Sequence, residues 1–273
     1  MTNQENLNLE LHHDAWMDLL TATLPDGSGY GRQQIDTAIN VDDIHHNPIL
    51  RSGMPTRGHE KLVAALSETA MTMEIDQWQG LATEPTTSVT LWASRYGIIE
   101  ATTDPSGLID LSLKPGGSIY KTVAQATRVG PRAPVEKPGG LPLTSKFLAN
   151  LFPGADAHIR RSALNQLAEL TAPLMPAVSR DLTRGQVSFL SLDIQLFCES
   201  GFRENALACM DTPSGFLIPL NTGGIFSRNK IELTAMPPWA VWQNILELMP
   251  NGADVALWHE LGEATVNERV VFD

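Results

Sequence analysis

The sequence has few basic residues and no long apolar run. Lysine and arginine together number 19, against 31 aspartate and glutamate residues, which gives a formal net charge of −12. Phosphate groups attract a concentrated basic stripe, and the sequence has none, so we expect no binding to nucleic acid. No apolar run approaches the roughly 20 residues that span a bilayer, so we expect no membrane insertion.

The sequence also has no signal-peptide pattern and few cysteines for disulfide bonds. Residues 1–10 are polar and carry no apolar signal core. The only cysteines are Cys198 and Cys209, which cannot make a disulfide framework in a chain of 273 residues. The two could face each other across a hairpin, so one bridge is geometrically conceivable. Nothing indicates an oxidising compartment, and the expected location is the cytoplasm.

The composition is that of a loop-rich globular protein, with 42% apolar residues, 21 glycines and 18 prolines. In the first half, apolar spacing predicts a Trp16-bearing helix at 12–24, a short strand at 35–41 and a helix at 59–70. Period-two alternation then predicts four strands, followed by a helix at 118–127. The four strands are placed at 71–75, 89–93, 97–102 and 108–113.

The second half repeats this order. A Pro- and Gly-rich segment at 131–142 reads as a linker. A helix is predicted at 159–171, and the closing helix begins at Pro237-Pro238, where a missing N–H costs nothing. Between the two helices four strands are predicted at 186–198, 205–210, 215–220 and 231–236.

A short motif recurs at the same place in both halves. The sequence ATTDPSGLIDL begins at Ala101, and ACMDTPSGFLIPL begins at Ala208. In each, an aspartate ends a strand, a Pro-Ser-Gly turn follows and a second apolar strand begins. The recurrence favours duplication. We therefore predict an α+β protein of two pseudo-twofold-related halves, each helix, four antiparallel strands and helix, in one compact domain with halves at about 10–130 and 143–250 and a tail at 251–273.

The same residues carry a resemblance to a known family. The long strand at 186–198, the turn segment MDTPSGFLIPL and the segment KIELTAMPPWAVWQNILELM resemble the EspG family of type VII (ESX) secretion chaperones from actinobacteria. Members of that family show a D-T-x-x-G-x turn between strands and a closing amphipathic helix. The resemblance covers roughly residues 10–250. Two departures are Phe216, where the family has a basic residue after the turn glycine, and the unmatched tail.

The resemblance implies a function in protein transport. EspG proteins are cytosolic chaperones that bind the exposed hydrophobic tip of a helical PE–PPE substrate pair and keep it soluble for export. They catalyse no reaction and use no cofactor, so the resemblance implies a non-enzyme whose partner is a helical secreted protein. The sequence does not determine the oligomeric state, and a homodimer is compatible with it.

No contact residue is carried over from the family, but the sequence offers its own candidates. Ile225 and Phe226 lie on a loop between strands, and Trp239 and Trp242 lie on the closing helix, where tryptophan is typical of interface anchors. Both pairs have an alternative interpretation. Tryptophans at helical spacing are more often core residues, and the loop pair fits core or surface equally.

Two other functions are alternatives for this sequence, a metal-dependent hydrolase and a scaffold protein. Asp42, Asp43, His45 and His46 offer carboxylate and imidazole ligands, so a metal-dependent hydrolase is the alternative enzyme reading. Neighbouring histidines in a strand point to opposite faces, however, and no metal-binding motif fixes a geometry, so a turn at the end of a strand is favoured. Ser214 lies in the repeated turn rather than in a nucleophile elbow. The third reading is a non-catalytic scaffold protein.

Overall fold

The computed structural model describes residues 7–12, 65–66, 69–94, 96–103, 108–130, 140–198, 201–221 and 231–250. Several segments named above therefore fall outside the described residues. They are 13–24 of the first predicted helix, the short strand at 35–41, most of the helix at 59–70, the first Pro-Ser-Gly turn at 104–107, the linker residues 131–139, the loop at 222–230 and the tail at 251–273.

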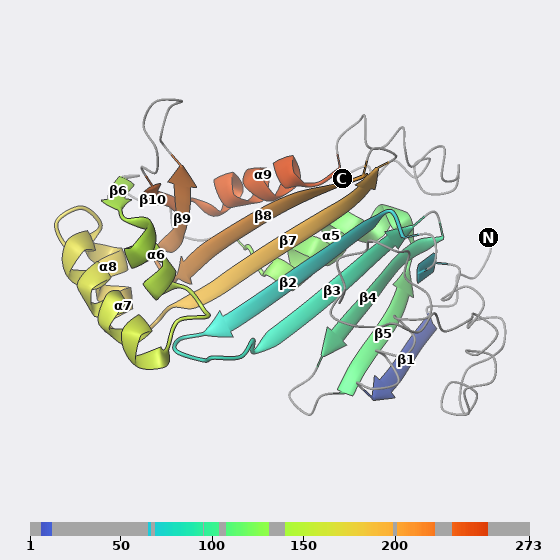
Figure 1. Ribbon diagram of the computed structural model, residues 1–273, viewed down its shortest axis with the longest axis horizontal. Coiled ribbons are helices and arrows are strands. Elements are labelled where there is room, and N and C mark those ends of the chain that lie inside the picture. Colours follow the sequence, from blue (N-terminus) through green and yellow to red (C-terminus); the bar gives the residue numbers. More distant parts are fainter. Residues whose placement is uncertain are drawn as a thin grey trace.

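One antiparallel sheet of ten strands organises the described chain (Figure 1). Its strand order is β1-β5-β4-β3-β2-β7-β8-β9-β10-β6. Strands β2 to β5 form one meander and β7 to β10 form another, and the two meanders meet where β2 pairs with β7. The strands are β1 (Leu7–His12), β2 (Met71–Gln79), β3 (Thr87–Ser94), β4 (Gly97–Thr103), β5 (Leu108–Lys114), β6 (Gly140–Leu143), β7 (Ser188–Cys198), β8 (Gly201–Thr212), β9 (Gly215–Asn221) and β10 (Ile231–Met236).

The pairing of β2 with β7 is the seam of the sheet. It runs from Met71 opposite Leu196 to Gln79 opposite Ser188. On each side of the seam, the four strands of a meander are followed by one edge strand. The edge strand, β1 on one side and β6 on the other, precedes its meander in the chain. The α+β class with a large antiparallel sheet is thus confirmed, while the relation of the halves by a twofold axis stays a prediction.

The eight meander strands are those that the sequence predicted, with β8 beginning four residues earlier than expected. Three predicted helices are present as α5 (Ile119–Thr127), α7 (Ala157–Thr171) and α9 (Pro238–Leu248). The second Pro-Ser-Gly motif is a hairpin turn as predicted, because Thr212 pairs with Gly215 across it.

Five short elements of the described residues were not predicted, namely β1, β6, α6 (Ser145–Leu151), α8 (Pro176–Thr183) and the 3-10 helix η1 (Gly116–Ser118). Strand β6 overlaps the end of the segment predicted as a linker and includes Pro142, which an edge strand tolerates because its outer N–H groups need no partner. Helix α6 has only seven residues and depends on its cap, where the Phe147 N–H donates to the Thr144 hydroxyl at 3.2 Å. Such elements are stabilised by tertiary contacts rather than by their own periodicity.

Helices α5 and α9 cover one face of the sheet, called here the rear face (Figure 1). Alternation turns Leu190, Leu192, Ile194 and Leu196 of β7 toward them, as the sequence predicted. Two side chains tie the helices to the strands. The Gln77 amide donates to the Ala126 carbonyl of α5 at 2.7 Å, and the Asn205 amide donates to the Leu248 carbonyl of α9 at 3.0 Å.

Helices α6, α7 and α8 cover only one end of the opposite, front face, on the left in Figure 1. Their inner side chains form a second core with the front-facing residues of the second meander, among them Phe189, Met210 and Leu217. None of the helices in the described ranges has the length and apolarity needed to cross a bilayer.

The conceivable bridge between the cysteines is ruled out by the strand register. Cys198 pairs with Gly201, whereas Cys209 pairs with Leu190. At about 3.3 Å per residue along β7, these positions are separated by roughly 25 Å, far beyond the ~7 Å limit between bridged Cα atoms. Cys209 is instead a buried member of the rear core.

We expect the seam to be sensitive to loss of core volume. Leu192 is fully buried at the centre of β7. Changing Leu192→Ala should lower the free energy of unfolding by about 2–5 kcal/mol, because it removes buried methyl groups and leaves a cavity. Urea denaturation measures this, and Leu170→Ala, at an exposed position of α7, should change the value by only about 0.5 kcal/mol. Similar effects of the two variants would contradict this core.

Candidate protein-docking surfaces

The residues proposed as metal ligands, Asp42, Asp43, His45 and His46, lie outside the described residues. Within the described ranges, no three histidine, cysteine or carboxylate side chains are grouped so as to hold a metal ion.

The two tryptophans of helix α9 that the sequence predicts as contacts differ in exposure. The Trp239 side chain is 69% exposed, whereas Trp242 is partly buried against the rear core. Leu246, one turn further along, is 40% exposed. Together these three residues form an apolar ridge on the outer side of α9, called here the α9 ridge. The other predicted pair, Ile225 and Phe226, lies outside the described residues.

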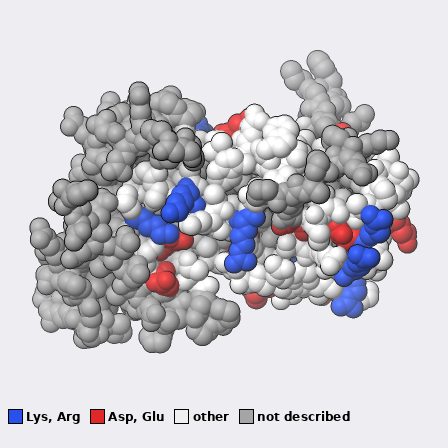
Figure 2. Space-filling view, turned by 180° about the vertical axis from the view of Figure 1, so that it is seen from behind, with Lys and Arg blue, Asp and Glu red and all other residues white. Residues whose placement is uncertain are grey.

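The rear face as a whole carries no concentrated charge in its described part. Basic and acidic side chains occur there in small, scattered groups (Figure 2). Lys114, which pairs with Ile98 of the rear core, forms an ion pair with Glu100. This agrees with the absence of a basic stripe in the sequence.

The front face of the seam is acidic, which sequence reasoning missed. Alternation turns Glu74 and Asp76 of β2 away from the rear core, and the register places Glu74 directly opposite Asp193 of β7. Glu204 of β8 lies on the same face, opposite Gln195. These four carboxylates are called here the acidic strip. Like charges directly opposite each other destabilise a sheet, so the arrangement is not one that folding alone favours.

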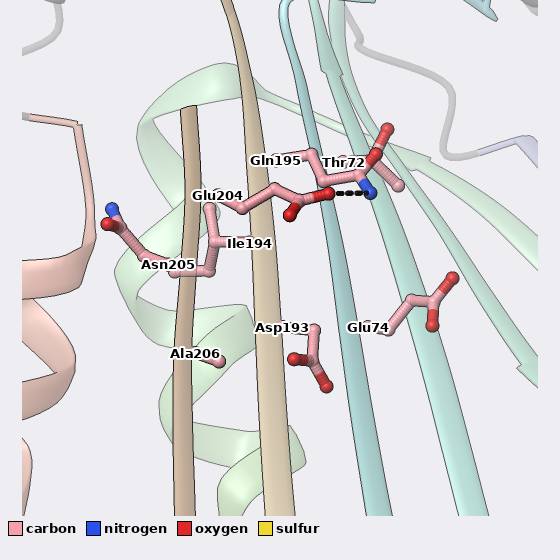
Figure 3. A pocket seen from close by; sticks show the side chains of 8 residues that line it. All are labelled: Thr72, Glu74, Asp193, Ile194, Gln195, Glu204, Asn205 and Ala206. Carbon is pink, nitrogen blue, oxygen red and sulfur yellow. Dashed lines mark hydrogen bonds between the residues drawn. The ribbon is translucent and has the colours of Figure 1, made fainter. Parts of the chain in front are cut away.

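Hydrogen bonds position part of this strip. The Ser191 hydroxyl donates to the Asp193 carboxylate at 2.9 Å, and the Gln195 amide donates to Glu204 at 3.3 Å (Figure 3). Burial, followed by repulsion from Asp76 and Asp193, raises the pKa of Glu74. Burial also raises the pKa of Asp76, against a lowering by the hydrogen bond from Ser88.

A hollow of about 350 Å³ lies among these side chains. Figure 3 shows Glu74 and Asp193 projecting from neighbouring strands. Thr72, two residues before Glu74, lines the same hollow and is only 5% exposed. Its hydroxyl has no hydrogen-bond partner in the described part of the chain. The remaining lining residues are Ile194, Gln195, Glu204, Asn205 and Ala206.

An apolar cleft of about 430 Å³ lies further along the same strands, toward the helices α6 to α8. One wall is the β2–β3 loop with Pro85, and the other is the α6–α7 connection with Phe152 and Pro153. Its floor is formed by strand residues, including Trp78, Phe189, Ser191 and Ala208. Aromatic rings and prolines thus form much of this concave surface, together with the polar side chains of Thr83, Glu84 and Ser191.

Arg160 fixes the two walls of this cleft relative to each other. Its side chain is fully buried, and its guanidinium donates from Nη2 to the Ala82 carbonyl of the β2–β3 loop at 2.6 Å. The guanidinium carbon lies 5.7 Å from the centre of the Phe189 ring, and Phe152 meets that ring edge to face at 5.7 Å. The loop, helix α7 and strand β7 are therefore held together, and the cleft is preformed.

Part of this site has a signal in the sequence. The alternation MTMEIDQWQ shows that β2 has one polar face, and SLDIQL shows the same for β7. No signal in either segment reports that the two polar faces become neighbours, because that depends on the pairing of β2 with β7 across more than a hundred residues of chain. Arg160 likewise reads as an ordinary surface arginine of an amphipathic helix.

Comparison with known proteins gives a limited result. No model of a known protein family matches the sequence, and no curated protein matches it significantly. A solved structure of the Mycobacterium tuberculosis type VII secretion system chaperone EspG5, in complex with a PE25–PPE41 dimer, is similar in structure, with 10% identity and a TM-score of 0.48 over 90% of this chain and 98% of that one. At that identity and score, the similarity does not establish membership of the chaperone family.

The acidic strip should make stability depend on pH. The pKa values of Glu74 and Asp76 in the folded protein lie above their ordinary values of 4.5 and 3.8, so the folded state binds these protons more tightly than the unfolded state. Their effect on the free energy of unfolding therefore becomes less favourable as the pH rises from about 4 through the raised values.

We expect Glu74→Gln to be more stable than the wild type at neutral pH by about 0.5 kcal/mol, because it removes one of two opposed charges. The difference should shrink as the pH falls, when Glu74 itself becomes protonated. Urea denaturation between about pH 5 and about pH 7.5 checks this. Glu169→Gln, at an exposed position of α7, is the control. A Glu74→Gln protein less stable than wild type at neutral pH would show that the carboxylate is stabilised by partners instead.

Proposed function

We propose that this protein is a cytoplasmic chaperone or adaptor that binds the hydrophobic tip of a helical type VII secretion substrate and keeps it soluble for export. Two things support this proposal. The first is the resemblance of the sequence to the EspG family, carried by the turn segment at 210–220 and the closing helix. The second, on which the choice of site rests, is the apolar cleft between the β2–β3 loop and the α6–α7 connection.

The cleft suits a convex partner. The tip of a helical hairpin presents a small knob of apolar side chains, and such a knob buries most surface in a concave pocket. Trp78 and Phe152, which are partly buried at the cleft, are aromatic residues of the kind that anchors protein interfaces. Because Arg160 holds the walls in place, binding would cost little ordering of the chaperone.

The cleft is too small to be the whole interface. Stable protein complexes usually bury about 800 Å² on each partner, so a partner seated in the cleft also covers neighbouring surface. The exposed side chains Ile159, Leu170 and Leu174 of the α6–α8 end provide apolar surface beyond it.

The α9 ridge is the rival docking surface. Trp239 and Trp242 belong to the helix that covers the rear face, whereas the cleft opens on the front face. A compact tip cannot contact both sides of the sheet. We propose the cleft because it is concave and fixed, whereas the ridge is convex. The contribution of Ile225 and Phe226 stays a prediction from the sequence.

The alternative function of a metal-dependent hydrolase depends on residues 42–46. No feature of the described residues favours this alternative. A scaffold protein would also bind other proteins, but it would not be needed to keep them soluble. Solubility of the partner is therefore the property that separates a chaperone from a scaffold.

The test begins with capture from the native host on tagged full-length protein, followed by mass spectrometry and gel filtration. The expected partner is a helical secreted protein in fixed stoichiometry that precipitates when expressed alone and stays soluble with this protein. Gel filtration of the free protein also reports whether it is a homodimer, which the sequence leaves open.

Three variants then locate the docking site by isothermal titration with the purified partner. Ala208→Arg places a long charged side chain on the cleft floor and should weaken binding at least about tenfold. Ala208→Ser and Trp239→Ser should bind like the wild type. If Trp239→Ser abolishes binding and Ala208→Arg does not, the ridge is the docking surface. If the partner is soluble alone, the protein is not its chaperone.

A further inference from the structure

Two carboxylates of the acidic strip, Glu74 and Asp76, are partly buried, whereas Asp193 and Glu204 are exposed. Glu74 and Asp193 are directly opposed across the seam, and Asp76 and Glu204 lie on the same face. Natural sheets usually place opposite charges or polar groups in such pairs. A cluster of like charges that folding does not favour is expected where a ligand compensates it.

The hydroxyl of Thr72 is an independent indication of a ligand. Thr72 is buried, its Oγ1 atom has no hydrogen-bond partner among the described residues, and the residue lines the hollow beside Glu74. A buried polar group without a partner costs free energy. A ligand that brings a hydrogen-bond donor into the hollow would satisfy this hydroxyl and the carboxylates together.

The negative charge of the acidic strip favours a cationic ligand, and the distance between the carboxylates indicates which kind of cation. Glu74 lies opposite Asp193, and Glu204 lies two residues along β8 from Ala206, the partner of Asp193, so Glu74 and Glu204 are about 12 Å apart at the backbone. A metal ion needs several oxygens at about 2.0–2.6 Å and cannot use so wide a set. The hollow of about 350 Å³ instead has room for a guanidinium or ammonium group, which donates several hydrogen bonds to separate carboxylates.

The strip is continuous with the apolar cleft. Ser191 and Ala208 lie on the floor of the cleft, and the next residues on the same face of their strands, Asp193 and Ala206, line the hollow. Same-face neighbours on a strand are separated by about 7 Å. The two surfaces therefore form one groove, apolar toward α6–α8 and acidic beyond, and its acidic part begins about 7 Å from the cleft.

We propose that the acidic strip receives an arginine or lysine side chain of the same partner whose apolar tip fills the cleft. This inference rests on the proposed function. It defines the partner more narrowly, as a helical tip with a basic residue about 7–13 Å from its apolar residues. The raised pKa values of Glu74 and Asp76 fit this role, since a cation in the hollow relieves the repulsion among the carboxylates.

A designed peptide tests the proposal without the natural partner. The probe is a fluorescein-labelled helical peptide of about 18 residues, long enough to hold a helix. It carries a leucine pair and, two turns or about 10 Å away on the same face, either an arginine or its neutral analogue citrulline. Fluorescence anisotropy with the full-length protein at low salt gives both affinities.

The wild type should bind the arginine peptide about tenfold more tightly than the citrulline peptide. The double variant Glu74→Gln/Asp193→Asn should reduce this preference to less than about twofold. The control Glu169→Gln/Glu247→Gln removes the same charge from exposed helix positions and should keep the preference. Circular dichroism confirms that each variant is folded.

Two outcomes would overturn the inference. If the control loses the preference as fully as the double variant does, only the general negative charge of the protein attracts arginine. If calcium alone gives a binding heat that Glu74→Gln/Asp193→Asn abolishes, the strip is an inorganic cation site. Failure of the proposed function looks different: the arginine preference would hold while no insoluble helical partner is found.

Discussion

The antiparallel pairing of β2 with β7 is the interaction on which the rest of the structure depends. Within the described sheet it is the strand pairing that joins the two meanders, and it aligns their pleats, so that the apolar sides of both strands face α5 and α9. The same alignment brings the polar sides together on the front. Because side chains alternate with period two, a slip of one residue in this register would exchange the two faces.

The two faces of the seam have different physical roles. The rear face is a closed apolar core sealed by two helices, with the Gln77 and Asn205 amides completing the backbone hydrogen bonds of those helices. On the front face, α6, α7 and α8 cover the end where Arg160 and Phe189 join the helices to the β2–β3 loop. The groove lies next to these helices, with an apolar cleft beside them and the acidic strip further along.

Much of the fold could be predicted because it follows local patterns. The alternation of Leu190, Leu192, Ile194 and Leu196 predicts a strand with one buried face, and Pro237-Pro238 followed by an apolar arc predicts α9. Strand β6 and helix α6 could not be predicted, since four and seven residues carry too little periodicity and depend on tertiary contacts. The site could not be predicted for another reason. Glu74 and Asp193 are opposite each other only because of the strand register, and Arg160 is buried only because of how α7 packs, and neither is encoded in a local sequence pattern. Trp239 is exposed rather than part of the core, and its role as a contact stays a prediction.

The central claim is that the groove on the front face of the seam is where a partner binds. Hydrogen–deuterium exchange of the free protein and of its complex with the captured partner tests this most directly, because it reports contact without altering any residue. The account predicts slower exchange in the complex at the β2–β3 loop, residues 80–86, and at the α6–α7 connection, residues 152–156, with helix α9 unchanged. Slower exchange confined to the outer residues of α9, with both walls of the cleft unchanged, would contradict it.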